Sequence, residues 1–236
     1  MMNKQDRLQT PIVIWMGFSI RMMLFAAALM WPAGTWHWWE AWILVILWTV
    51  FGIVMTVYLL HHDPALLAER MRLVPLHKDQ KSWDKILMLL FVVGGIGLYI
   101  VPGFDVVRYH WSEPLPLWMK ILAMLVHIPC FFLLGWIMRE NTFLSQVVKI
   151  DEQRGHQVIS TGPYALVRHP MYSVIIVLLY AVPVALGSRL SLILAFLLTV
   201  LITVRTYLED RTLFAELRGY KQYAQATPYR LLPGLW

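Results

Sequence analysis

The sequence predicts an all-α protein: a polytopic transmembrane helical bundle of about six spans with both termini in the cytoplasm. Of its 236 residues, 59% are hydrophobic and only 14% are Asp, Glu, Lys or Arg, whereas a soluble domain carries about a quarter charged residues. The apolar residues gather in long runs, which is the pattern of a chain that has the bilayer as its solvent. In addition, Lys and Arg concentrate in alternate loops.

Six stretches have the roughly 20 apolar residues that are needed to cross a hydrocarbon core of about 30 Å. In chain order they are residues 11–31, 39–60, 86–104, 117–138, 171–187 and 190–208. The first is too long, and too clearly bounded by Trp, for a cleaved signal peptide. The fifth is the shortest and contains Pro183, so we expect a kinked helix or one that ends early.

The basic residues predict the orientation. Sixteen of the twenty Lys and Arg fall in the N-terminus, the second and fourth loops and the C-terminal tail, whereas only Arg108 and Arg189 fall in the loops of the other side. Because basic loops are retained in the cytoplasm, both termini should be inside. The net charge of +6 is therefore a topology signal and not a nucleic-acid patch. The lipid bilayer is the expected partner, and the compact chain suggests a multi-pass protein of a bacterial inner membrane.

Several classes of site find no support in the sequence. It contains neither a Gly-rich dinucleotide fingerprint nor a phosphate-binding P-loop, and it has no closely spaced Cys/His zinc pattern. His61, His62 and Asp63 are adjacent, so their side chains point in different directions from a helix end. We interpret them as a polar turn closed by Pro64, and we expect no metal. Cys130 lies in an apolar run, which favours a buried small hydrophobe.

Polar and small residues inside the spans have two interpretations. Gly94, Gly95 and Gly97 lie in the third span, where small residues let helices approach closely. Arg21 is either a functional charge or a group packed against a carboxylate or backbone. Lys120 also lies within a span and has no obvious partner there. A transporter would predict paired mid-membrane charges and an internal repeat, and the sequence shows no repeat.

The fourth loop enters the fifth span through irregular backbone. Val158 and Ile159 favour an extended chain, and Gly162 followed by proline marks a turn. Pro170 keeps His169 out of the helical region. Irregular backbone at the bilayer is tolerated where it lines a cavity. We therefore expect a polar and aromatic cavity here, suited to a nucleotide-like ligand.

A simpler interpretation of this loop stays open at this point. Arg168 and His169 can flank the helix as interfacial charges, with Tyr172 in the aromatic belt, as is common at the cytoplasmic ends of spans.

A second polar group lies at the inner end of the sixth span. Arg205 and Glu209 are four residues apart and so share a helix face, with Asp210 beside them. An exposed ion pair of this kind contributes only a few tenths of a kcal/mol, and a cation preceding an anion is the poorer order. Ligand contacts are the alternative: Arg for an anionic head group and Glu for a hydroxyl or cation. Both polar groups emerge on one membrane face, which favours a single composite site.

Together these motifs resemble the isoprenylcysteine carboxyl methyltransferase (ICMT)-like family of integral membrane methyltransferases. The matching residues are Gly162-Pro163-Tyr164, Arg168-His169-Pro170-Met171-Tyr172, Glu209-Asp210, Gly219-Tyr220 and Tyr223. The resemblance covers roughly residues 141–236, and residues 63–72 and 83–85 are similar to the upstream loop of bacterial members. It implies two regions: residues 1–138, with N-terminal helices and a cytoplasmic loop at 61–85, and a catalytic region at 139–236.

The resemblance implies S-adenosyl-L-methionine as the methyl donor. Carried over position by position, the cofactor contacts are His156, Gln157, Val158, Ile159, Tyr164, His169, Pro170, Met171, Tyr172 and Glu209, with Lys149 at a further, weakly matching position. Arg205 matches the position that meets the substrate head group, and with Glu209 it forms the expected catalytic pair. This sequence departs from the family at Val174, where a glycine is usual, and at Asp210, where a second glutamate is usual.

The expected function is methyl transfer to a lipophilic or small membrane-permeant acceptor at the cytoplasmic face, the acceptor being a carboxylate, a thiol or an amine. Two alternatives remain open on the sequence alone. One is an NADPH-dependent membrane reductase of the sterol-reductase type, and the other is a non-catalytic membrane protein or transporter.

Overall fold

The computed structural model describes residues 11–71, 80–144, 147–148 and 157–236. Within these residues the structure is helical and contains no strand. The long helices are α2 (Pro11–Ala33), α3 (Trp39–His62), α5 (Ser82–Pro102), α6 (Leu117–Glu140), α7 (Pro170–Leu186) and α8 (Leu190–Glu216). The short elements are α4 (Pro64–Arg70), the π-helix η1 (Gly103–Arg108), the 3-10 helix η3 (Gly162–Ala165) and α9 (Tyr220–Ala226). The predicted all-α fold is confirmed.

Among the residues that the structure describes, five helices are long and apolar enough to cross a membrane, and the shorter apolar helix α7 accompanies them. This agrees with the prediction of about six spans. Helices α2, α3, α6 and α8 continue beyond the ends of the predicted apolar runs, whereas α7 agrees with its run to within one residue at each end. Helix α8 has 27 residues and is therefore about 40 Å long, longer than the hydrocarbon core of about 30 Å. Its last turns, which contain Glu209 and Asp210, belong to the polar end of the bundle.

Helix α7 is the shortest long helix, as the sequence predicted for the fifth span. Its 17 residues span about 25 Å, less than the core of about 30 Å. Pro183 lies inside the helix, which ends three residues later at Leu186. Gly187 follows with φ of 82°, a left-handed conformation that glycine adopts without strain and that commonly terminates a helix.

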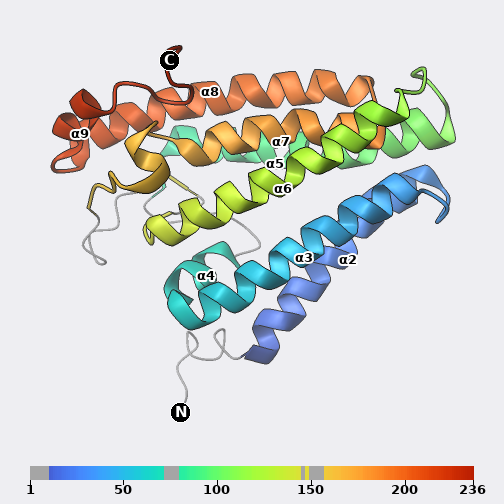
Figure 1. Cartoon of the computed structure of the whole chain (residues 1–236), viewed down its shortest axis with the longest axis horizontal. Helices are drawn as coiled ribbons and strands as arrows, with labels where there is room; N and C mark the ends of the chain where they lie inside the picture. The colour runs from blue at the N-terminus through green and yellow to red at the C-terminus, as the bar shows by residue number, and fades with distance from the viewer. Residues whose placement is uncertain (1–10, 72–79, 145–146, 149–156) are drawn as a thin grey trace.

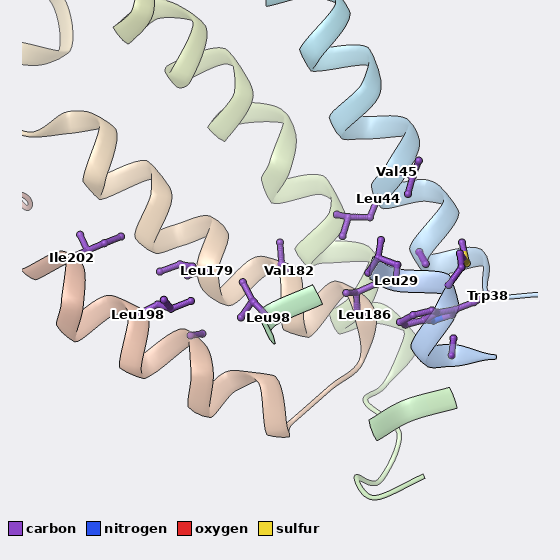
Figure 2. Packing of buried hydrophobic residues seen from close by; sticks show 14 of the residues in the cluster. Leu29, Trp38, Leu44, Val45, Leu98, Leu179, Val182, Leu186, Leu198 and Ile202 are labelled. Carbon is purple, nitrogen blue, oxygen red and sulfur yellow. The ribbon is translucent and has the colours of Figure 1, made fainter. Parts of the chain in front are cut away.

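The apolar core joins most of the long helices. α6 packs against α7, α5 against α8, and α7 against α8. Figure 2 shows the largest cluster of buried hydrophobic residues, including Leu98, Val182 and Leu198, to which α2, α3, α5, α7 and α8 contribute. A Cβ on Gly94 would lie 2.8 Å from Leu198 Cδ2, and one on Gly97 would lie 3.3 Å from Leu194 Cδ1. The interpretation of these two glycines as helix-packing residues is confirmed, whereas a Cβ on Gly95 would meet nothing within 4 Å.

The two charges predicted inside the spans have partners. Lys120 Nζ lies 2.6 Å from Glu40 Oε1, so the absence of an obvious partner for Lys120 in the sequence was misleading. The two residues are 80 positions apart and meet only because the first turns of α3 and α6 lie at the same end of the bundle. Arg21 donates to the backbone oxygen of Met71. This contact agrees with the interpretation of Arg21 as a group packed against backbone.

The two ends of the bundle differ. Figure 1 shows α4 and α9 at one end, together with the golden turn of η3, while the connections of α2 to α3, α5 to α6 and α7 to α8 lie at the other. The end with α4, η3 and α9 contains the longer connections that the sequence predicted to bear the chemistry. We call it the site end. The buried Cys130 lies within α6, as predicted.

Candidate active site

A cavity with an empty volume of about 780 Å³ opens at the site end, between α7, α8, α9 and the segment before α7. Nine residues that the resemblance assigned to the cofactor line it: Gln157, Val158, Ile159, Tyr164, His169, Pro170, Met171, Tyr172 and Glu209. The other two, His156 and Lys149, lie outside the described residues. Asn141, Leu144, Leu213, Leu217, Tyr220 and Tyr223 complete much of the wall, and sequence reasoning assigned none of them to the site.

The segment before α7 is held by a turn that requires glycine. Gly162 has φ of 56°, in the left-handed region that costs a side chain about 1–2 kcal/mol. A Cβ there would lie 2.9 Å from Glu140 Cγ and 3.0 Å from Trp136 Nε1. Thr161 Oγ1 donates to Glu140 Oε2 at 2.7 Å. These contacts hold the turn closely against the end of α6, at the residue where η3 begins. The residues that precede the turn thereby lie along the cavity.

Tyr164 anchors the 3-10 turn to two neighbouring elements. Asn141 Nδ2 donates to the Tyr164 hydroxyl at 2.9 Å, and the Tyr223 hydroxyl donates to the Tyr164 carbonyl at 2.7 Å. Burial raises the pKa of Tyr164 well above its usual value, and burial also raises that of Tyr223. Both phenols are therefore neutral at physiological pH and act as fixed hydrogen-bonding groups in the cavity wall.

Asp210 is the centre of a buried charge network. Arg168 Nε and Nη2 donate to its two carboxylate oxygens at 2.9 and 3.0 Å. Arg230 Nε donates to Oδ2 at 2.9 Å, and the Tyr220 hydroxyl donates to Oδ1 at 2.8 Å. The Asp210 side chain is 1% exposed. Such a two-pronged pair between Arg and a carboxylate is geometrically specific, so Asp210 fixes the start of α7 relative to α8.

The C-terminal tail completes this network through its backbone. Arg168 N donates to Tyr229 O and His169 N to Arg230 O, both at 2.9 Å. Arg168 Nη1 also donates to the carbonyls of Thr227 and Pro228 at 2.9 and 2.8 Å. The tail thus satisfies the backbone of the irregular residues before α7, which would otherwise be buried without partners.

Arg168 and His169 are each 6% exposed, so their interpretation as interfacial flanking charges is wrong. His169 Nε2 lies 3.4 Å from Asp210 Oδ1. The His169 ring stacks on Tyr172 with centroids 5.7 Å apart and an interplanar angle of 11°. Both rings line the cavity, which gives it a flat aromatic surface beside polar groups.

The Tyr172 hydroxyl lies between the two charged residues predicted on α8. It donates to Glu209 Oε2 at 2.5 Å and accepts from Arg205 Nη1 at 2.7 Å. Tyr172 therefore bridges the predicted i,i+4 pair. Because Tyr172 comes from α7, the two polar groups that the sequence predicted to form one composite site are directly connected.

Arg205 is oriented by a carboxylate that sequence reasoning did not assign. Arg205 Nε donates to Asp84 Oδ1 at 2.8 Å. Asp84 Oδ2 accepts from Gln80 Nε2 at 3.0 Å and from the backbone N of Val148 at 2.9 Å. Asp84 is fully buried in the first turn of α5. A carboxylate at the start of an apolar helix was the available signal, but its partner is 121 positions away.

The loop after α3 approaches the cavity from another side. Asp63 Oδ1 accepts from Leu66 N at 2.9 Å and caps α4, and Thr142 Oγ1 donates to Asp63 Oδ2. Arg70, at the end of α4, places Nη2 3.3 Å from the sulfur of Met171. Arg70, which sequence reasoning did not assign, is thus connected to the cavity through Met171, whereas Arg168 is the arginine in the cavity lining itself.

The predicted polar turn at His61 and His62 ends α3, and Pro64 begins α4. His61 Nδ1 lies 2.8 Å from Val57 O and His62 Nδ1 lies 2.9 Å from Tyr58 O. The described residues contain no group of three or more His, Cys, Asp or Glu that could hold a metal ion.

Comparison with known proteins agrees with the geometry. Residues 121–215 match the model of the isoprenylcysteine carboxyl methyltransferase (ICMT) family. The matched segment contains most of α6, the loop before α7, α7 and nearly all of α8, and so most of the cavity lining. A search of curated proteins finds no match. The family match supports a membrane methyltransferase.

Proposed function

We propose, from the premise that the chain is an ICMT-like membrane protein, that it transfers a methyl group from S-adenosyl-L-methionine to a lipophilic or small membrane-permeant acceptor at the cytoplasmic membrane face. The supporting observation is the single cavity that gathers nine of the ten residues assigned to the cofactor. These residues come from two parts of the chain, residues 157–172 and Glu209 on α8, which meet at the site end.

The residues in this cavity fit the proposed cofactor. The Glu209 carboxylate lines the cavity and is half-buried, which suits it to accept hydrogen bonds from ribose hydroxyls or to face a cation. The stacked His169 and Tyr172 rings offer a flat surface beside the polar groups of the cavity.

When bound, S-adenosyl-L-methionine would supply an electrophilic methyl group on a sulfonium: transfer to an acceptor nucleophile forms a bond to the methyl carbon, breaks its bond to sulfur and releases a neutral thioether. This chemistry depends chiefly on alignment. The chain contributes that alignment through contacts made before any ligand arrives: Asp210 fixes the loop, and Tyr172 fixes Glu209. Tyr164 and Tyr223 close the wall of the cavity.

We propose Arg205 as the acceptor-side residue, for a carboxylate, thiol or amine acceptor. Arg205 as a whole residue is 9% exposed. Its guanidinium is oriented by Asp84 and Tyr172. A guanidinium held in this way needs little reorganisation when a polar head group approaches. Asp84 also balances its charge, so a neutral acceptor does not leave an uncompensated cation in the buried site.

The first test is calorimetric titration of detergent-purified protein with S-adenosylhomocysteine. Glu209→Gln keeps the size of the side chain and removes its charge, and we expect binding at least about tenfold weaker, or about 1.4 kcal/mol. Glu216→Gln is the matched control, because Glu216 lies on the same helix and pairs with Lys81 at the surface. A folded wild-type protein that fails to bind S-adenosylhomocysteine but binds NADPH would instead support the reductase.

A further inference from the structure

A second hollow lies on the side of the bundle, between α3 and α6, and is separate from the site. It has an empty volume of about 1470 Å³. Apolar side chains of both helices form its walls, among them Val50, Val54 and Phe132. Figure 1 shows α3 and α6 as neighbouring blue and green helices. We call this hollow the lateral groove.

Two stacked aromatic rings form the floor of the lateral groove. Phe51 of α3 and Phe131 of α6 stack with centroids 4.5 Å apart and an interplanar angle of 11°. Toward the site end, a Cβ on Gly135 would lie 3.4 Å from the sulfur of Met55, so the helices approach closely there. The walls stay open, with Val54 58% and Phe132 72% exposed. A floor between two raised walls shapes a trough for a flexible chain.

The length of the groove matches one leaflet of a bilayer. On α3 it runs from Ile46 to Tyr58, a distance of about 18 Å at 1.5 Å per residue. Half of a hydrocarbon core of about 30 Å is about 15 Å. The groove therefore extends from near the middle of the membrane to the site end, which is the path of one acyl chain.

The only charged residue that lines the groove within the described chain is Arg139. It lies one residue before the end of α6, at the site end, and is exposed. The neighbouring carboxylate, Glu140, interacts electrostatically with Arg139 but has hydrogen-bond donors of its own, Trp136 Nε1 at 3.1 Å and Thr161 Oγ1 at 2.7 Å. A cation at the mouth of an apolar trough is complementary to an anionic lipid head group.

We propose that the lateral groove binds an anionic phospholipid of the leaflet at the site end, with an acyl chain along the groove and the phosphate at Arg139. Trp136 forms part of both the groove and the support of Gly162, so the lipid would lie against the far side of the wall that holds the cofactor loop. The proposal does not depend on methyl transfer, because none of its residues belongs to the cavity lining.

The test is native mass spectrometry of delipidated, detergent-purified protein incubated with phosphatidylglycerol or with phosphatidylcholine of the same acyl chains. We expect the wild type to retain one phosphatidylglycerol with a preference of about fivefold, the contribution of one basic residue near an anionic lipid surface. Arg139→Gln should abolish this preference. Arg218→Gln, which removes another exposed Arg at the site end, should leave it unchanged.

Two further variants test the trough itself. Val54→Trp and Ile46→Trp fill it from two positions along α3, so one suffices if the other does not fold, and each should prevent retention of both lipids. Val93→Trp is the matched control: Val93 is 60% exposed on α5 and lies outside the groove. Equal retention of the two lipids by the wild type would overturn the proposal, as would equal losses in the groove variants and the Val93 control.

Discussion

The guanidinium of Arg168 and the carboxylate of Asp210 face each other through two parallel hydrogen bonds of 2.9 and 3.0 Å, both groups being almost completely buried. Arg168 belongs to the irregular segment before α7 and Asp210 to the extension of α8. This pair therefore determines how the loop lies over the end of the bundle, and the Arg-His-Pro motif is in part a structural anchor.

We expect Asp210→Asn to lower the free energy of unfolding by about 3 kcal/mol, because removing one partner leaves a buried cation without its counterion. Unfolding in detergent, followed by a spectroscopic probe, measures this loss. The matched control is Glu113→Gln, which breaks the pair of Arg189 with a side chain that is 84% exposed and should have no measurable effect. An equal loss in both variants would contradict the role of Asp210.

Tyr172→Phe should weaken binding of S-adenosylhomocysteine about tenfold while leaving the protein folded. The substitution keeps the ring that stacks on His169 and removes only the hydroxyl that bridges Arg205 and Glu209. An unpaired buried polar group costs about 1–3 kcal/mol, and the carboxylate loses its fixed orientation. Titration calorimetry measures the effect. Tyr180→Phe, two turns further along α7, is the control, and unchanged affinity of Tyr172→Phe would show that the bridge does not support binding.

Gly162→Ala should destabilise the protein by more than about 2 kcal/mol, since the side chain adds left-handed strain to its clash with Glu140 and Trp136. Gly95→Ala is the opposite case, because a Cβ there meets nothing within 4 Å and alanine favours helix by about 1 kcal/mol. Thermal unfolding of the two variants should therefore shift in opposite directions. A neutral Gly162→Ala would mean that the turn tolerates a side chain.

Alkaline pH should destabilise the protein through Tyr220. Burial, and then the carboxylate of Asp210, raise the pKa of Tyr220 well above its usual value. An acid with a folded-state pKa above the unfolded value of about 10 contributes stability that is fully present below that pH and is lost as the pH rises through the folded pKa. Thermal midpoints measured at rising pH test this. Tyr220→Phe should be less stable at neutral pH and should decline less steeply, and an unchanged slope would exclude Tyr220 as the source.

Much of the fold and of the cavity could be predicted because the signals are local. Long apolar runs marked the spans, and the residues from Gln157 to Tyr172 precede or begin one helix, so they necessarily emerge together. Glu209 ends a neighbouring span on the same face. That these residues share one end of the bundle followed from the chain direction and the length of a helix, whereas their individual assignment to a cofactor came from the family resemblance.

The missing parts depend on contacts between distant segments. The sequence placed Arg205 in the site but did not reveal Asp84, which meets it only when α5 and α8 pack. Arg168 and His169 pair with residues 229–230 of the tail through backbone groups. Every residue type carries such groups, so the amino-acid sequence does not indicate this pairing. Lys120 and Glu40 likewise meet only across two helices.

The tail contacts also impose an order on biogenesis. Residues 227–230 follow every spanning helix in the sequence, and the carbonyls of Thr227 and Pro228 lie 59 and 60 positions beyond their donor, Arg168. The ribosome delivers about 5–20 residues per second, so α7 and α8 exist for seconds before the groups that satisfy the loop are synthesised. A nascent chain arrested after α8 would have its helices inserted but its loop unsecured. Capture of a ligand by the cavity would therefore report that residues 227–230 have been synthesised and that the helices have been inserted.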